Sequence, residues 1–114
     1  MTFTYADYPN MGFHLKFENG YRISVQWGGM NYGSNRHKQY PSNNSTTAEV
    51  AIWDSADKPV RMIHKGNRAN RIIELSPDGE DVLGWINTDD VVTLMGMVAS
   101  IKTSGNRLGD AIFA

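Results

Sequence analysis

The residues of this chain best suited to chemistry are cations, and they gather in two stretches. Between positions 58 and 71 the chain carries three arginines, two lysines and a histidine without a single acid. A second, shorter run, Arg36-His37-Lys38, lies in a polar stretch. Guanidinium and ammonium groups bind phosphates and carboxylates, so a pocket that joined the two stretches would suit a phosphate or an acidic protein surface. The predicted binding residues are Arg36, His37, Lys38, Trp53, His64, Lys65, Arg68 and Arg71.

The order of the charges leaves a second interpretation open. Six acids lie between positions 72 and 90, and no base follows them until Lys102. The basic and acidic blocks could therefore neutralise each other, either across neighbouring strands or between subunits. In that case the cations would serve stability rather than ligand binding.

Trp53 stands out among the three tryptophans, each of which ends a predicted strand. It alternates with Val50 and Ile52, so it points to the same side as Glu49 and Ala51 and away from the apolar set. A tryptophan at a strand end is commonly a core or rim residue. On this side of the sheet, beside the basic block, it is also a candidate stacking platform or interface anchor.

Several kinds of active site are excluded or unsupported. The chain has no cysteine, which removes disulfides, thiolate nucleophiles and Cys-based metal sites. His14, His37 and His64 fall in separate elements, without the spacing of a helical zinc site, so we predict no bound metal and no cofactor. The G-x-S-x-G elbow and the Walker and Rossmann glycine patterns are absent. An enzyme would have to use His37 or His64 as a general base.

Composition indicates one ordinary folded domain over residues 1–114. Hydrophobic residues make up 40% of the chain and charged residues 20%, with a formal net charge of −1. No overall field therefore draws the protein to nucleic acid or to an anionic membrane. The sequence lacks an apolar run of membrane-spanning length, and residues 1–12 lack the pattern of a signal peptide. We expect a cytoplasmic protein with no membrane partner.

The elements that must position these residues are mostly strands. Apolar and polar residues alternate over 13–17 and again over 21–27, and Asn19-Gly20 between them predicts a tight hairpin turn with positive φ values. Further strands are predicted over 48–53, 60–64, 72–75 and 81–86. Residues 1–11 are predicted to be an N-terminal arm, 30–47 a long polar loop and 106–114 a tail.

The last predicted element is a helix over 88–102. Thr88 is a suitable N-cap, and Asp89 and Asp90 place negative charge on the first turn. Strands followed by one helix predict an α+β domain, an antiparallel sheet of five to six strands with the C-terminal helix packed on one face. The predicted core comprises Phe13, Leu15, Phe17, Tyr21, Ile23, Val25, Val50, Ile52, Val91, Leu94, Met95 and Val98.

Three segments carry a resemblance to known proteins. They are FENG at 17–20 with ISVQWG at 23–28, the pair Asn31-Tyr32, and AEVAIWD at 48–54, with similar patterns at 84–85 and 88–91. Together they resemble small uncharacterised proteins found in bacteriophage and prophage genomes. The resemblance covers about three quarters of the chain by the extent of these segments. It implies an accessory factor acting on host machinery, including anti-defence proteins, and it supplies no catalytic residues.

Two functions from different classes remain. The first is a non-enzymatic phage accessory protein that binds a host protein, or sequesters a phosphorylated or nucleotide ligand, through the basic loop region. The second is a small enzyme that cleaves or modifies a nucleotide. A virion component is a third possibility that no residue favours. Charge blocks of opposite sign, and apolar residues beyond the core such as Trp53, Met97 and Phe113, further predict a homo-oligomer, most simply a dimer.

Overall fold

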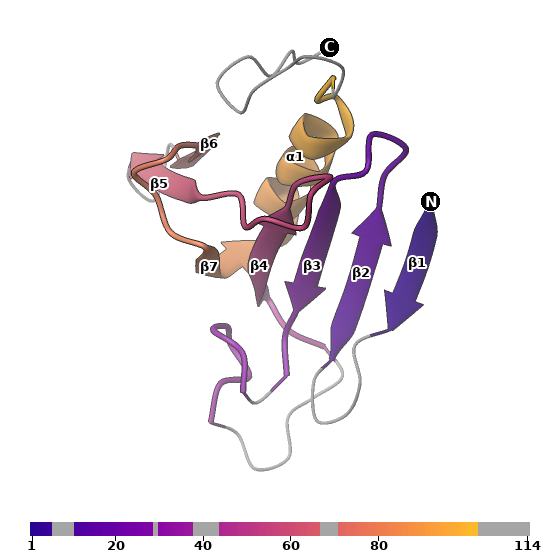
Figure 1. Cartoon of the computed structure of the whole chain (residues 1–114). Coiled ribbons are helices and arrows are strands. Elements are labelled where there is room, and N and C mark those ends of the chain that lie inside the picture. The colour runs from indigo at the N-terminus through magenta and orange to yellow at the C-terminus, as the bar shows by residue number, and fades with distance from the viewer. Residues whose placement is uncertain (6–10, 29, 38–43, 67–70, 103–114) are drawn as a thin grey trace.

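The computed structural model describes residues 1–5, 11–28, 30–37, 44–66 and 71–102 (Figure 1). It confirms the α+β class predicted from the sequence. One sheet has five antiparallel strands in the order β1-β2-β3-β4-β7. Their bounds are β1 (Thr2–Tyr5), β2 (Gly12–Lys16), β3 (Arg22–Gln26), β4 (Thr47–Trp53) and β7 (Val82–Asn87). A separate hairpin pairs β5 (Met62–Gly66) with β6 (Arg71–Leu75), and α1 (Thr88–Ala99) ends the series.

The N-terminus differs from the prediction. Instead of an irregular arm over 1–11, residues Thr2–Tyr5 form β1 at the edge of the sheet (Figure 1). Phe3 lies opposite Leu15 of β2, so the short Thr-Phe-Thr-Tyr run continues the inner and outer alternation of its neighbour. A four-residue run is too short for its own periodicity to reveal a strand, and its pairing with β2 decides the outcome.

Alternation along the strands separates an inner, apolar face from an outer, polar face. The strands β2, β3 and β4 place their buried aliphatic side chains in register, with Leu15 opposite Ile23 and Ile23 opposite Ile52. Helix α1 lies over β3, β4 and β7 and buries Val91, Leu94 and Val98 (Figure 1). Nine of the predicted core residues are buried, and the other three, Phe13, Phe17 and Met95, are partly buried against them.

Seven further side chains enter the core. Ala48 and Ile101 come from the predicted strand 48–53 and the predicted helix 88–102, and the others come from segments whose docking the sequence did not reveal. The hairpin β5–β6 packs beside β7 and α1, which buries residues that have no clear period of their own. The additional core residues are Ala48, Val60, Met62, Ile73, Leu83, Ile86 and Ile101.

Helix α1 is shorter than the predicted 88–102. Its N-cap is Asn87 rather than Thr88, because the Asn87 Oδ1 accepts a hydrogen bond from the Asp90 backbone N–H at 2.8 Å. At the other end the helix stops at Ala99, and Ser100 N–H bonds back to the last turn. Within the described residues, no helix is long and apolar enough to cross a membrane.

The turn between β2 and β3 is tight but not of the predicted kind. Only Gly20 has a positive φ there, +86°, so Asn19 keeps an ordinary backbone conformation. The Phe17 N–H donates to the Tyr21 carbonyl and the Gly20 N–H to the Phe17 carbonyl, which closes a three-residue loop ending in glycine.

Asn19 connects this turn to the end of α1. Its Nδ2 donates to the carbonyls of Val98 and Ile101 at 2.8 and 2.9 Å, and its Oδ1 accepts from the Tyr21 N–H at 2.9 Å. Carbonyls at the end of a helix lack the usual partner one turn further on. This side chain gives the Val98 carbonyl a donor beside the Ile101 N–H, and it pairs the Ile101 carbonyl beyond the helix end.

Gly96 offers a site for stabilising the protein. It lies in the exposed middle of α1, where a Cβ would meet no other atom within 4 Å. Glycine costs a helix roughly 0.5–1 kcal/mol relative to alanine because the unfolded chain has more freedom to lose. We expect Gly96→Ala to raise the free energy of unfolding by about that amount, measured by urea denaturation. An unchanged or lower value would mean that this part of α1 is not a regular, solvent-facing helix.

Candidate functional site

The described part of the predicted 30–47 loop is built on two buried amides. Asn35 is 1% exposed, and its Nδ2 donates to the Trp27 carbonyl at 2.9 Å. Asn31 is buried as well, and its Oδ1 accepts from the Gly28 N–H at 2.9 Å. Each amide takes the place of a backbone partner, so residues 30–37 are tied to the end of β3.

Three side chains stack on the surface that this loop creates. The guanidinium carbon of Arg36 lies 3.9 Å from the centre of the Tyr32 ring, and the Tyr32 and Trp85 rings are 5.5 Å apart at 47°. Tyr32 remains 44% exposed and Trp85 50% exposed. We call this cluster the Arg36–Tyr32–Trp85 stack. Cation–π and aromatic contacts of this kind hold the rings in a defined orientation while they still face solvent.

The backbone positions the stack from two elements. The Trp85 N–H of β7 donates to the Tyr32 carbonyl at 2.8 Å, and the Tyr32 N–H donates to the Glu49 carboxylate of β4 at 2.7 Å. Gly84 permits the close approach, because a Cβ there would lie 2.4 Å from the Tyr32 Cβ. The loop, β4 and β7 therefore converge on Tyr32.

Trp85 has an unusual backbone conformation. Its φ is +53°, in the left-handed region that a bulky residue rarely adopts. The pairing of β4 with β7 shifts register between Ala48 and Val50, where β7 fits an extra residue. Because of this extra residue, Trp85 does not share the buried face of Leu83, as it would in a regular strand, and its side chain is exposed. Such strain costs stability, and it persists here because the register shift and the bond from the Trp85 N–H to the Tyr32 carbonyl hold the backbone in place.

Two other apolar side chains on the same elements are also exposed. Met30 precedes Tyr32 in the loop, and its carbonyl accepts a hydrogen bond from the Arg36 guanidinium at 3.4 Å. Val82 begins β7, three residues before Trp85. Met, Tyr, Trp and Arg are the residue types enriched at protein–protein interfaces.

The predicted basic site is distributed over separate parts of the structure. Arg36 belongs to the stack beside the start of β4, whereas Lys65 lies in the β5–β6 hairpin and pairs with Glu74 at 3.0 Å. A second pair, Arg61 with Asp81 at 3.3 Å, joins the two charge blocks in the same way. These contacts favour mutual neutralisation for this part of the basic block.

The remaining predicted residues lie as follows. His37 is exposed with a φ of +64°, and His64 sits in β5 with its Nε2 buried and without a hydrogen-bond partner among the described residues. Trp53 points to the outer face, as its alternation predicted, and carries the Arg22 guanidinium over its ring. Arg71 begins β6, and nothing is described of its side chain. Lys38, Arg68 and the predicted tail over 106–114 lie outside the described residues.

Sequence reasoning missed both aromatic members of the stack. In a regular strand Trp85 would share the face of Leu83, so only knowledge of the bulge could have exposed it. Gly84, directly before Trp85, was the one local sign of a close approach. The sequence around Tyr32 does not indicate its role, because its contacts are with β4 and β7, which lie far away in the chain.

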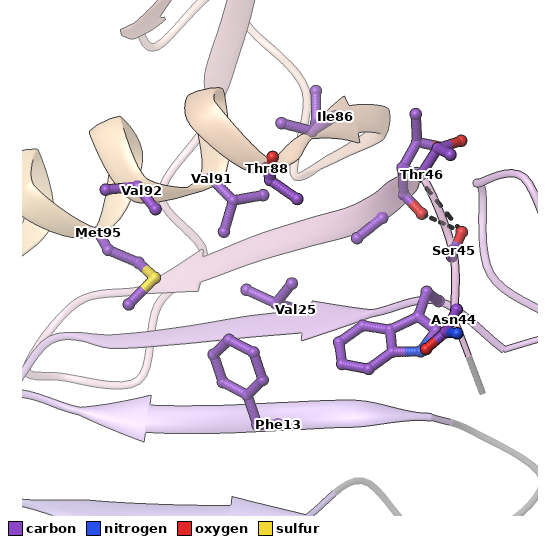
Figure 2. A pocket seen from close by; sticks show the side chains of 13 residues that line it. Phe13, Val25, Asn44, Ser45, Thr46, Ile86, Thr88, Val91, Val92 and Met95 are labelled. Carbon is purple, nitrogen blue, oxygen red and sulfur yellow. Dashed lines mark hydrogen bonds between the residues drawn. The ribbon is translucent and has the colours of Figure 1, made fainter.

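An apolar groove on the inner face is a second feature of the surface (Figure 2). It has a volume of about 480 Å³, and it opens between α1 and the sheet. No charged side chain lines it, so it does not suit the phosphate that the sequence suggested. Its lining residues are Phe13, Val25, Trp27, Asn44, Ser45, Thr46, Thr47, Ala48, Ile86, Thr88, Val91, Val92 and Met95.

The described residues show no group of three or more His, Asp or Glu side chains that could hold a metal ion. The Arg36–Tyr32–Trp85 stack combines two exposed aromatic rings with an arginine, the residue types that dominate protein interfaces. Comparison with protein-family models, with curated proteins and with solved structures gave no match.

Proposed function

We propose that this chain is a non-enzymatic binding protein that recognises a partner protein through the Arg36–Tyr32–Trp85 stack. The observation that carries the proposal is the exposure of two aromatic rings that the fold holds in place at the cost of a strained Trp85 backbone. Aromatic and arginine side chains dominate the binding energy of protein interfaces, and rigid ones lose little entropy on binding.

The resemblance to small bacteriophage and prophage proteins supports a partner of the host cell. An accessory protein of this kind, including one that counters a host defence complex, acts by occupying a surface and needs no catalytic group. The proposal sets this contact in the cytoplasm, of the host cell if the chain is phage-encoded.

A protein partner suits the stack better than a nucleotide. One face of Tyr32 is already covered by the Arg36 guanidinium at 3.9 Å, so a base cannot stack there without displacing it. The Glu49 carboxylate, held 2.7 Å from the Tyr32 backbone nitrogen, adds negative charge beside the rings. That charge offsets the positive charge of Arg36, so the stack has no excess of cations to attract a phosphate, whereas a protein surface can meet both charges with complementary groups.

The test compares three variants in affinity capture from bacterial lysate, followed by calorimetry with the purified partner. We expect Tyr32→Ser and Trp85→Ser each to weaken binding by about 30-fold or more, the size of an interface hot spot. Val92→Ser, which removes an apolar side chain that is 67% exposed on α1, is the matched control and should bind normally. A partner that binds all three variants equally would contradict the proposal.

The enzyme alternative keeps one supporting observation, the buried His64 Nε2 without a partner among the described residues. Incubating the protein with a panel of nucleotides and analysing the products by mass spectrometry separates the possibilities. Turnover that is lost in His64→Gln would establish the enzyme. Intact nucleotide recovered from the protein would establish sequestration instead.

We also propose that two copies associate through β1. This strand is an edge of the sheet, carries no charge or proline to block pairing, and exposes Phe3. Met97, considered for this role from the sequence, packs against the core instead. We expect light scattering to report twice the monomer mass, and Phe3→Lys to restore the monomer. Val92→Lys, on the exposed side of α1, is the control, and a wild-type monomer at all micromolar concentrations would refute association.

A further inference from the structure

A row of four polar and aromatic side chains crosses the outer face of the sheet. The strand register places Thr2 of β1 opposite Lys16 of β2, Lys16 opposite Arg22 of β3, and Arg22 opposite Trp53 of β4. Residues directly opposite on antiparallel strands point to the same side. Hydroxyl, ammonium, guanidinium and indole groups therefore stand side by side across four strands.

These side chains line a pocket on the face opposite to α1. It has a volume of about 430 Å³, which is within the range of small-molecule sites. The next row along the strands completes it, with Thr4 opposite His14. Its full lining is Thr2, Thr4, His14, Lys16, Arg22 and Trp53, with two permanent cations and no acid.

The pairing of Lys16 with Arg22 is unfavourable by itself. Like charges directly opposite on antiparallel strands destabilise a sheet, and among the described residues no acid lies within ion-pair distance of Lys16. Arg22 has one acidic neighbour, Asp57, whose carboxylate lies 3.6 Å from the guanidinium and is 83% exposed. That exposed contact is weak, so the pocket stays positive overall.

The Arg22 guanidinium is held in place by Trp53, and one of its N–H groups has no hydrogen-bond partner among the described residues. Its guanidinium carbon lies 4.5 Å from the centre of the Trp53 ring, which fixes the plane of the group. Its Nε is buried and has no hydrogen-bond partner among the described residues. The Arg22 side chain as a whole remains 40% exposed, so a ligand in the pocket can still reach the guanidinium.

We infer that this pocket binds the phosphate group of a small phosphorylated molecule. Phosphate oxygens would accept from the Arg22 guanidinium and the Lys16 ammonium, which relieves the repulsion between the two cations. The Thr2 and Thr4 hydroxyls provide further donors, and His14 adds a ring nitrogen on the adjacent row. Sites of this kind favour Arg for its planar fork of donors and Lys for its compact charge. The inference does not rest on the Arg36–Tyr32–Trp85 stack, which involves none of these residues.

The test is isothermal titration calorimetry with inorganic phosphate, pyrophosphate and AMP at constant ionic strength. We expect the wild type to bind at least one of these probes, and Lys16→Gln to weaken that binding about ten-fold or more. Arg22→Lys keeps the charge but loses the fork and should also bind more weakly. Lys65→Gln, which removes a lysine from the β5–β6 hairpin, is the matched control and should bind as the wild type does.

Thermal unfolding, measured without a ligand and again with the phosphate probe, adds an independent readout. Lys16→Gln should melt no lower than the wild type, because it removes the repulsion with Arg22, yet it should lose the rise in melting temperature that the phosphate probe produces. Tighter binding of AMP than of phosphate and pyrophosphate would identify a nucleotide, and the reverse a non-nucleotide phosphate. No binding of any probe by the wild type, or equal losses in Lys16→Gln and Lys65→Gln, would overturn the inference. Trp85→Ser should leave phosphate binding unchanged. The phosphate-pocket inference and the proposed role of the Arg36–Tyr32–Trp85 stack can therefore fail independently of each other.

Discussion

Leu94→Ala is expected to lower the free energy of unfolding by about 2–5 kcal/mol, the range for removing a large buried aliphatic side chain. Leu94 is 0% exposed and lies in the middle of the buried face of α1, between Val91 and Val98. The loss combines the transfer of the side chain to water with the cavity left between helix and sheet. Urea denaturation monitored by circular dichroism measures it directly.

Val92→Ala is the matched control for this prediction. Val92 lies on the same helix but is 67% exposed, so its truncation should change the stability by less than about 0.5 kcal/mol. A small effect of Leu94→Ala, or equal effects of the two substitutions, would show that α1 does not dock through this face.

Gly84→Ala is expected to have the largest effect on the Arg36–Tyr32–Trp85 stack. The new Cβ would lie 2.4 Å from the Tyr32 Cβ and 3.2 Å from the Tyr32 carbonyl, so the loop must move away from β7. Displacement of a packed backbone by one methyl group costs about 1–3 kcal/mol. It should also separate the Tyr32 and Trp85 rings, change the near-ultraviolet circular dichroism and abolish binding of the partner protein.

Gly96→Ala supplies the control for Gly84→Ala, because it makes the same chemical change in the same chain at a position with open space. Gly96→Ala should stabilise the protein and leave the near-ultraviolet circular dichroism unchanged. Gly84→Ala should destabilise the protein and change that signal. If Gly84→Ala left both the aromatic signal and the stability unchanged, Tyr32 would not be packed against β7 as the structure has it.

Much of the fold was predictable because it depends on local periodicity. Alternation over 13–17, 21–27 and 48–53 predicted β2, β3 and β4 to within one residue at each end, and the face of Trp53 followed from the same period. The helix followed from its apolar face, although its N-cap moved by one residue to Asn87. Local signals also left the basic block ambiguous, since charge order does not specify which cation meets which acid.

The candidate sites depend on contacts between residues far apart in the chain. Tyr32 meets Trp85 only because β7 pairs with β4 and fits an extra residue there, and no periodicity marks that bulge. Lys16 and Arg22 lie opposite each other because of the register of the β2–β3 hairpin. That register can be predicted from the sequence once the length of the turn is known.

By itself the sequence determined the α+β class, the strands of the central hairpin, the buried face of the helix and the exclusion of cysteine chemistry. Each of these follows from the types and the spacing of nearby residues. The tertiary structure decided that β1 is an edge strand, that Lys65 is neutralised by Glu74, and that Arg36 stacks on Tyr32. These outcomes depend on strand order and loop docking, and both are set by the packing of the whole domain rather than by any one segment.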